Sequence, residues 1–246
     1  MLKKERIRMR IAIASRKGGV GKSSITASIA SLLASDGYDV LAIDLDPQSN
    51  LAFMLGVDPT APGTAALLDG ENPEPIEVNE RLYVLPGGAD LARQDIARLD
   101  PEDLADALED FDYDFILFDN PPGNQHLERL AIVAADKALV VTNAHPMAIL
   151  GAERVLSDLE ARYQKKRKGP SSWAIVMNMI DARRSLDKNI EDMFEDVEDV
   201  PKFKVRQDTK ISMASAQGYE LSEFAPHCNA ARDLRKIKEW CVGEED

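Results

Sequence analysis

The sequence predicts an α/β fold in which a doubly wound, mostly parallel sheet is flanked by helices on both faces. Short, continuous apolar segments alternate with helix-prone stretches along the chain, and such segments are typical of strands that are buried on both faces. A glycine-rich loop joins the first strand to the first helix, so ligands are expected at the carboxyl ends of the strands. At 246 residues the chain can bury one large core, and we expect a single domain over 1–246.

The expected elements follow one another in a regular order. Apolar runs predict strands at 11–14, 40–44, 82–86, 115–119, 138–142 and 173–178. Helix-prone stretches lie at 24–33, 124–133, 148–163, 186–194 and 230–241. Residues 58–80 are rich in proline, glycine and glutamate, which indicates a long solvated excursion.

Residues 16–24 read RKGGVGKSS and predict a phosphate-binding loop. Glycines at this density let backbone N–H groups turn toward phosphate oxygens, which a Cβ atom would obstruct. Lys22 can reach the β- and γ-phosphates, and the Ser23 hydroxyl can bind Mg²⁺. The strand before the loop and the helix after it place the anion at a helix N-terminus. The predicted nucleotide-binding residues here are Lys17, Gly18, Gly19, Val20, Gly21, Lys22, Ser23 and Ser24.

Lys17 lies at the start of the loop, where a general phosphate-loop pattern requires no lysine. The run from Lys17 to Ser23 resembles the deviant Walker A box of the ParA/MinD superfamily of P-loop ATPases. The resemblance implies ATP and Mg²⁺ as ligands and a homodimer in the ATP state, with Lys17 reaching the partner's nucleotide. A second cation would then meet the charge that develops on the transferred phosphoryl group. Alternatively, Lys17 adds positive charge near the phosphates of its own subunit.

Two segments with carboxylates follow predicted strands. Residues 44–50, DLDPQSN, resemble the superfamily's second box, which implies that Asp46 orients the attacking water and that Asp44 supports the Mg²⁺ and phosphate-loop network. Residues 115–123, FILFDNPPG, resemble the Walker B strand, which implies an outer-shell metal role for Asp119. The expected metal residues are therefore Ser23, Asp44 and Asp119, and the expected catalytic residues are Lys17, Lys22 and Asp46. Aspartates that leave a strand are also common as turn and cap residues.

Asn178 lies in residues 176–181, VMNMID, which resemble the strand whose asparagine recognises adenine. An amide offers both the donor and the acceptor that an adenine edge requires. The loop at 142–146, TNAHP, departs from the proline-rich loop that is common after this strand in the superfamily. We expect His145 to be a structural loop residue.

Within the superfamily, the match favours small ParA-type partition and positioning ATPases. Residues 83–91, and residues 213–218 with Leu221, resemble further segments of these proteins, and the ten residues before the first strand are too few for an N-terminal helix-turn-helix domain. The resemblance implies a switch that binds nonspecific double-stranded DNA in its ATP state and positions a plasmid, a chromosome region or a large protein assembly. Hydrolysis would be slow until a ParB-like or adaptor protein stimulates it.

The net charge of −13 is concentrated in one segment. Residues 69–114 carry 15 acidic and 3 basic side chains, whereas the rest of the chain carries 28 and 27. A basic face elsewhere is therefore compatible with phosphate contacts. The predicted DNA contacts are Arg183, Arg184, Arg206 and Lys210, where the ParA resemblance places basic residues. The basic cluster at 165–168, KKRK, is expected to be only an accessory DNA-binding patch. It ends a predicted helix, where cations also neutralise the negative end of the helix dipole.

Two other functions remain as alternatives. A MinD-like membrane-associated positioning ATPase would need a basic amphipathic C-terminal helix, but residues 243–246, GEED, would be repelled by anionic lipid. Packing of Leu234, Ile237 and Cys241 in the core is the better interpretation of that helix. The second alternative is a metabolic deviant Walker A enzyme, either a nitrogenase-reductase-like protein or an ATP-dependent synthetase. A bridging iron–sulfur cluster would need cysteines near the nucleotide, and neither Cys228 nor Cys241 follows a motif strand. No substrate-binding constellation stands out for a synthetase. Without a membrane-spanning run or a signal peptide, the protein is expected to be cytoplasmic, and the ParA resemblance implies that it associates with the nucleoid.

Overall fold

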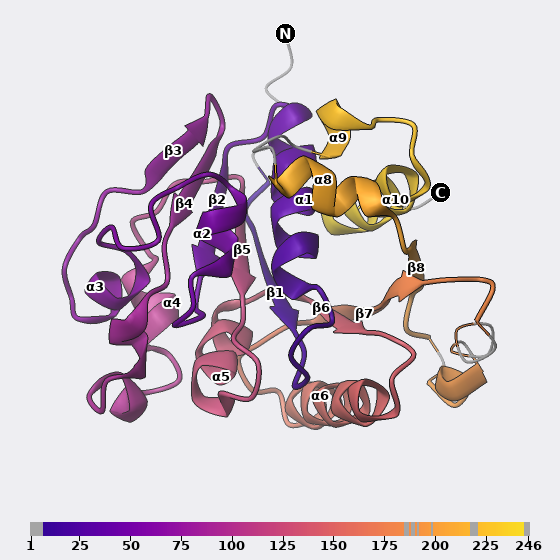
Figure 1. Ribbon diagram of the computed structural model, residues 1–246. Coiled ribbons are helices and arrows are strands. Elements are labelled where there is room, and N and C mark those ends of the chain that lie inside the picture. Colours follow the sequence, from indigo (N-terminus) through magenta and orange to yellow (C-terminus); the bar gives the residue numbers. More distant parts are fainter. Residues whose placement is uncertain are drawn as a thin grey trace, which may run out of the picture.

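The computed structural model describes residues 7–184, 187, 190, 192–197, 199–216 and 221–243. Eight strands of this part form one sheet in the order β3-β4-β2-β5-β1-β6-β7-β8. All neighbouring strands are parallel, except that β3 runs antiparallel to β4. Helices lie on both sides of the sheet (Figure 1). The predicted doubly wound α/β fold is therefore confirmed.

All the predicted strands are present, with ends that differ by at most a few residues. The strands are β1 (Met9–Ala14), β2 (Val40–Asp44), β3 (Ile76–Asn79), β4 (Leu82–Leu85), β5 (Phe115–Asp119), β6 (Lys137–Thr142), β7 (Ser172–Ile180) and β8 (Lys202–Arg206). The sequence analysis missed the edge strands β3 and β8. Only Val205 of β8 is fully buried, because an edge strand has one open side and therefore lacks the continuous apolar run of a central strand.

The helices are α1 (Lys22–Ser35), α2 (Asn50–Met54), α3 (Thr64–Leu68), α4 (Asp103–Ala107), α5 (Gln125–Ala134), α6 (Pro146–Gln164), α8 (Thr209–Ala216), α9 (Leu221–Phe224) and α10 (Asn229–Val242). Short 3₁₀ turns lie at Ala89–Ala92, Ile96–Arg98 and Asp192–Phe194. The helix expected at 186–194 lies partly outside the described residues. Gln217, Gly218 and the acidic residues 244–246 lie wholly outside them. None of the described helices is long and apolar enough to cross a bilayer.

The two faces of the sheet have separate cores. One core contains Leu67 of α3, Leu104 of α4, Leu130 of α5 and Leu159 of α6. The expectation that 58–80 is a solvated excursion is therefore wrong for α3, which packs in the core, and for β3, which joins the sheet. Residues 69–72, between these two elements, are exposed.

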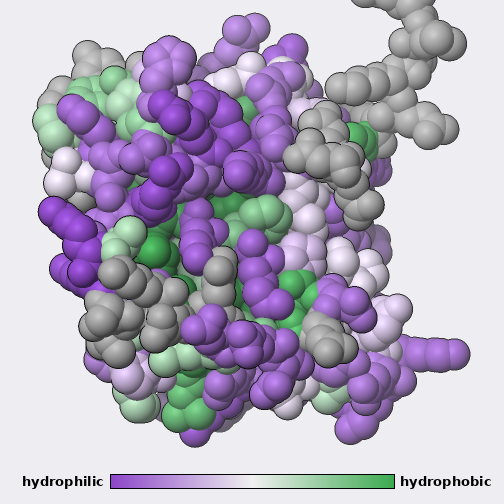
Figure 2. All heavy atoms as spheres, turned by 90° about the vertical axis from the view of Figure 1, so that its right-hand side faces the viewer, coloured by the Kyte–Doolittle hydropathy of each residue, from purple (hydrophilic) through white to green (hydrophobic). Residues whose placement is uncertain are grey.

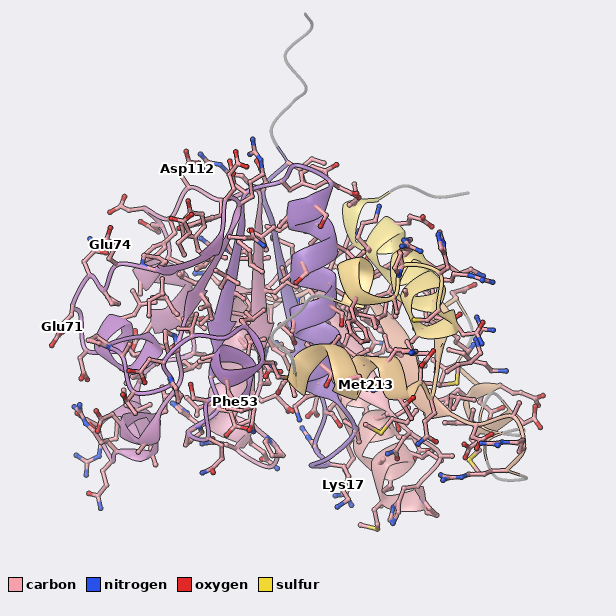
Figure 3. All side chains as sticks on the ribbon, turned by 45° about the horizontal axis from the view of Figure 1, so that its top comes forward. Lys17, Phe53, Glu71, Glu74, Asp112 and Met213 are labelled. Atoms are coloured by element: carbon pink, nitrogen blue, oxygen red, sulfur yellow. The ribbon has the colours of Figure 1, made fainter. Side chains whose placement is uncertain are left out.

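The other core contains Ile29 of α1 together with Leu234, Ile237 and Cys241 of α10. These three α10 residues are almost fully buried, which confirms that the apolar face of the C-terminal helix packs on the body of the protein. The acidic residues Glu71, Glu74 and Asp112 lie far from Lys17 (Figure 3).

Candidate nucleotide-binding site

The loop between β1 and α1 has a backbone that requires glycine. Gly19 has φ +76° and Gly21 has φ +90°, which is the left-handed region that other residues rarely adopt. A Cβ at Gly21 would lie 2.3 Å from Asn178 Nδ2. No side chain among the described residues caps α1, and its first turn has no acidic residue. The first amides of α1 are therefore available to an anion.

Gly21→Ala should destabilise the protein more than Gly19→Ala does. Each variant forces alanine into left-handed backbone, at a cost of about 1–2 kcal/mol. A Cβ at Gly19 has nothing within 4 Å, whereas at Gly21 it clashes with Asn178 and costs about 1–3 kcal/mol more. Denaturant unfolding measures both, and equal stability of the two variants would contradict the described loop geometry.

Lys22 is buried beside carboxylates. Its side chain is 6% exposed, and this burial lowers the pKa of its ammonium group, while the negative charges of Asp119, Asp46 and Glu128 oppose that shift. The lysine thus lies at the helix N-terminus within reach of the carboxylates that follow β2 and β5. Such a cation suits a ligand that carries several negative charges.

Asp44 and Asp119 end neighbouring parallel strands and are directly paired in the sheet register. Both oxygens of Asp44 are occupied: Oδ1 accepts the amide of Asp46 at 2.9 Å, and Oδ2 accepts the amides of Leu51 at 2.9 Å and Ala52 at 3.4 Å. Burial, and then the charge of Asp119, raise the pKa of Asp44 to about 7. Asp44 therefore fixes the loop that carries Asp46.

Asp119 has the features of a residue behind a metal ion. It is 1% exposed, and burial raises its pKa to about 6 although the Ser23 hydroxyl, Lys22 and Thr26 oppose the shift. Thr26 Oγ1 donates to Asp119 Oδ1 at 3.3 Å, whereas Oδ2 is buried without a hydrogen-bond partner among the described residues. Mg²⁺ keeps several waters and needs few carboxylates, so a hydrated Mg²⁺ fits this donor set.

Asp46 is held by its own loop. Its Oδ1 accepts the amide of Gln48 at 2.9 Å, and its backbone oxygen accepts the amides of Ser49 at 2.9 Å and Gly88 at 3.3 Å. A Cβ at Gly87 would lie 2.2 Å from the same backbone oxygen. The loop after β4 is therefore packed against Asp46 and restricts where its carboxylate can lie.

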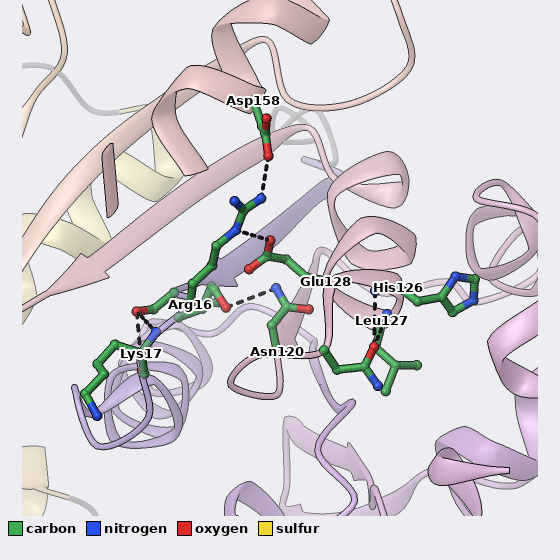
Figure 4. Close-up of polar contacts among 10 residues, drawn as sticks. Arg16, Lys17, Asn120, His126, Leu127, Glu128 and Asp158 are labelled. Carbon is green, nitrogen blue, oxygen red and sulfur yellow. Dashed lines mark hydrogen bonds and ion pairs between the residues drawn. The ribbon is translucent and has the colours of Figure 1, made fainter. Parts of the chain in front are cut away.

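The phosphate loop carries two lysines in opposite environments. Lys17 is exposed and extends outward at one edge of the molecule (Figure 3). It has no ion-pair partner among the described residues, whereas the preceding Arg16 donates to Glu128 Oε1 at 3.4 Å and also bonds Asp158 (Figure 4). Arg16 thus attaches the start of the loop to α5 and α6 while Lys17 stays available.

Asn178 lies within β7 and is 3% exposed. Its Nδ2 donates to the Val20 backbone oxygen at 2.8 Å, so it joins β7 to the phosphate loop. An amide group has a second N–H and an acceptor oxygen, so Asn178 can still form hydrogen bonds to a base.

His145 Nδ1 accepts the amide of Met147 at 3.1 Å as the N-cap of α6, which confirms a structural role for this loop residue.

The predicted DNA-contact residues lie on the β7–β8 side of the molecule. Arg183 and Arg184 line a cleft that also contains Gln207, next to Arg206. Hydrophilic side chains cover most of the face seen from the β8 side (Figure 2). Arg183 bonds Asp181 at 2.9 Å and Arg206 bonds Asp233 at 2.7 Å, while the exposed Lys210 lies 5.9 Å from the Phe224 ring centroid. Three of these cations thus already have carboxylates nearby, since Arg184 lies 4.0 Å from Asp181.

Several site residues were missed by the sequence analysis. Thr26 follows Lys22 by one helical turn, and Glu128 lies on the buried face of the apolar helix α5. A polar residue on the buried face of a helix next to the phosphate loop is a sequence signal that could have identified both residues. Asn120 Nδ2 donates to the Ile13 backbone oxygen at 3.0 Å. This contact and the one between Arg16 and Asp158 span more than a hundred residues, and no local pattern indicates them.

Comparisons with known proteins agree with this geometry. A family model described as an AAA domain matches residues 8–169. The chromosome-partitioning ATPase Soj of Thermus thermophilus is 32% identical over 94% of each chain.

Two solved structures have the same fold. The septum site-determining protein MinD of Pyrococcus horikoshii, solved with Mg-ADP, is 27% identical with a TM-score of 0.77, covering 95% of this chain and 96% of its own. Apo McdA of Cyanothece has a TM-score of 0.82 at 23% identity, over 96% and 100% of the two chains, which is a likeness of fold. The chain therefore belongs to the ParA/MinD superfamily of P-loop ATPases.

Proposed function

We propose that this protein is an ATP-dependent switch that dimerises when it binds ATP, binds nonspecific double-stranded DNA in that state, and positions or partitions a cargo. The observation that carries the proposal is the contrast between the two loop lysines. Lys22 is buried among carboxylates, whereas Lys17 is exposed and has no ion-pair partner among the described residues. A second lysine directed away from its own site fits a role in the partner subunit's site.

Within one subunit, the phosphate loop would bind the phosphates of ATP through Gly18, Gly19, Val20, Gly21, Lys22, Ser23 and Ser24, and Asn178 would bind the base. Lys17 would complete the phosphate site of the partner subunit. Mg²⁺ would be held by Ser23 with Asp119 behind it, and it would neutralise charge on the β- and γ-phosphates. Asp44 would act on this network through the Asp46 loop, since its oxygens already accept three amides.

Hydrolysis needs a water held in line with the γ-phosphate. Asp46 suits this task because Gln48 and the backbone contacts with Ser49 and Gly88 restrict its position. Lys22 would stabilise charge on the phosphoryl oxygens from its own subunit, and Lys17 would do so from the partner. Until a ParB-like or adaptor protein improves this arrangement, turnover would stay slow.

The DNA contacts would be Arg183, Arg184, Arg206 and Lys210. In each subunit the arginines would have to give up their ion pairs with Asp181 and Asp233 to bind DNA phosphates. Because this exchange costs free energy, one subunit offers only a weak half-site. Dimerisation joins two half-sites and raises their effective concentration. The packing of α10 on the core and the burial of Cys241 support this function over membrane binding or an iron–sulfur enzyme.

Replacing Arg183, Arg184 and Lys210 together with glutamine should weaken binding to duplex DNA and flatten its salt dependence. If about four to six phosphates are neutralised per dimer, log affinity falls against log salt with a slope of roughly −4 to −5. The slope should become shallower in the variant, while ATP-driven dimerisation stays intact. Titration of unrelated duplexes at several salt concentrations in ATP measures both quantities.

A matched control replaces Arg81, Arg93 and Arg98 with glutamine, which removes the same charge from the acidic segment. Its affinity and slope should equal those of the parent. If instead the R183Q/R184Q/K210Q protein keeps the parent's affinity and slope, the proposed DNA surface is wrong.

A further inference from the structure

A cavity of about 350 Å³ is lined by residues of α5, α6 and the loop that follows α6. Its lining contains more cations than carboxylates. Glu128 and Asp158 are the acids, and the cations are Arg16, Arg129, Arg162, Lys165 and Arg167. Arg16, the first residue of the phosphate loop, also lines the cavity, whereas residues 17–24 do not.

The two carboxylates are already bonded to one cation. Arg16 contacts Glu128 through Nε and Asp158 through Nη2 (Figure 4). The other four cations have no ion-pair partner among the described residues. One arginine balances only one of the two carboxylates, so the five cations and two carboxylates leave a net charge of +3 around this cavity, in a chain whose net charge is −13.

The end of α6 does not account for these cations. Its last carbonyls already accept backbone amides: the Ala161 oxygen from Lys165 at 3.4 Å, the Tyr163 oxygen from Lys166 at 2.9 Å and the Arg162 oxygen from Arg167 at 3.1 Å. Side-chain cations are therefore not needed to cap the helix. Arg129 lies on the other helix, α5, and so does not belong to the end of α6.

The cations are close enough to repel one another. Arg162 Nη2 donates to the Lys168 backbone oxygen at 2.5 Å, which fixes the guanidinium. Burial, and then the positive charges of Arg129 and Arg167, lower the pKa of Arg162, while the negative charges of Glu102 and Asp158 oppose the shift. An anion in the cavity would relieve this repulsion.

We propose that this cavity binds a phosphate group. Arginine forks match phosphate oxygens in a bidentate manner, and the five cations and two carboxylates of the lining leave three net positive charges, which is more than a ligand with one carboxylate would neutralise. A phosphate group carries up to two charges in the same volume. The proposal does not depend on nucleotide hydrolysis at the phosphate loop.

Calorimetric titration of inorganic phosphate into the full chain tests the proposal. Saturating Mg-ADP fills the phosphate loop, and ionic strength is held constant. Replacing Arg129 and Arg167 with glutamine should weaken phosphate binding at least tenfold, and the conservative Arg167→Lys should lose less. Arg154→Gln is the matched control, because it removes an exposed α6 cation that does not line the cavity, and it should bind like the parent.

Thermal unfolding gives a second readout that checks folding. Without phosphate, the R129Q/R167Q protein should unfold at the parent's temperature or above it, because repulsion is removed. Phosphate should raise the midpoint of the parent but not of the variant. Equal phosphate affinity and equal midpoint shifts in parent and variant would overturn the proposal.

Competition identifies the source of the phosphate group. Displacement by a short DNA duplex assigns it to a nucleic-acid backbone, displacement by phosphatidylglycerol vesicles assigns it to a lipid headgroup, and displacement by neither assigns it to a free phosphate; each result supports the site. A six-residue glutamate peptide that binds more tightly than phosphate would overturn the assignment.

Discussion

Lys22→Ala is expected to abolish ATP binding, and with it hydrolysis and dimerisation. The Lys22 ammonium is buried beside Asp119, Asp46 and Glu128. Arg16 pairs with Glu128, but the Lys22 charge acts on Asp119 and Asp46, beside the place where the phosphates would lie. Without it, the phosphates would meet uncompensated negative charge. We expect the affinity for ATP to fall by at least ~100-fold, since charge-assisted hydrogen bonds to several phosphate oxygens are lost together.

Lys17→Ala is the matched control for this loss. It removes a lysine from the same loop, but Lys17 is exposed and directed outward, so a single subunit should keep nucleotide affinity within a few fold. Binding of a fluorescent ATP analogue at low protein concentration measures both variants. If Lys22→Ala binds as tightly as Lys17→Ala does, the assigned roles of the two lysines are wrong.

Asp46→Ala is expected to keep ATP binding and dimerisation but to lose hydrolysis by at least ~100-fold, the scale on which a positioned base contributes. The carboxylate is 7% exposed and lies in a loop fixed by Asp44, Gly87 and Gly88. Phosphate release in single-turnover conditions measures the rate.

Asp46→Asn separates the charge of this residue from its place in the loop. An asparagine oxygen can still accept the Gln48 amide, which Asp46 Oδ1 accepts at 2.9 Å, so the loop is retained while the basic carboxylate is lost. Both variants should be equally slow. Near-normal hydrolysis by the asparagine variant would show that Asp46 acts through the loop alone.

The centre of the fold and of the site could be predicted from the sequence because its signals are local. The strands that end in Asp44 and Asp119 are buried along their whole length, so their apolar runs show both the strands and the shared edge where the two carboxylates are paired. The dense glycines likewise indicate the left-handed backbone at Gly19 and Gly21.

The remaining features depend on contacts between distant parts of the chain. Arg206 is the last residue of β8, and its guanidinium bonds Asp233, which is 27 residues away in the sequence. Helix α3 has only five residues, which is too short for the apolar periodicity of a buried helix to be recognised. Its burial could therefore not be predicted from the sequence of residues 58–80. The attachment of Arg16 to Asp158 and the cavity beside it arise only when α5 and α6 are placed together on the sheet.

The claim that ATP joins two subunits through Lys17 is tested most directly by light scattering of Asp46→Ala with ATP and Mg²⁺. This variant should hold the ATP state long enough to be measured. We predict that its mass will double from that of one chain with ADP to that of two with ATP, and that Lys17→Ala in the same background will remain at the mass of one chain. An unchanged mass of one chain for both the parent and Asp46→Ala with ATP would contradict the claim.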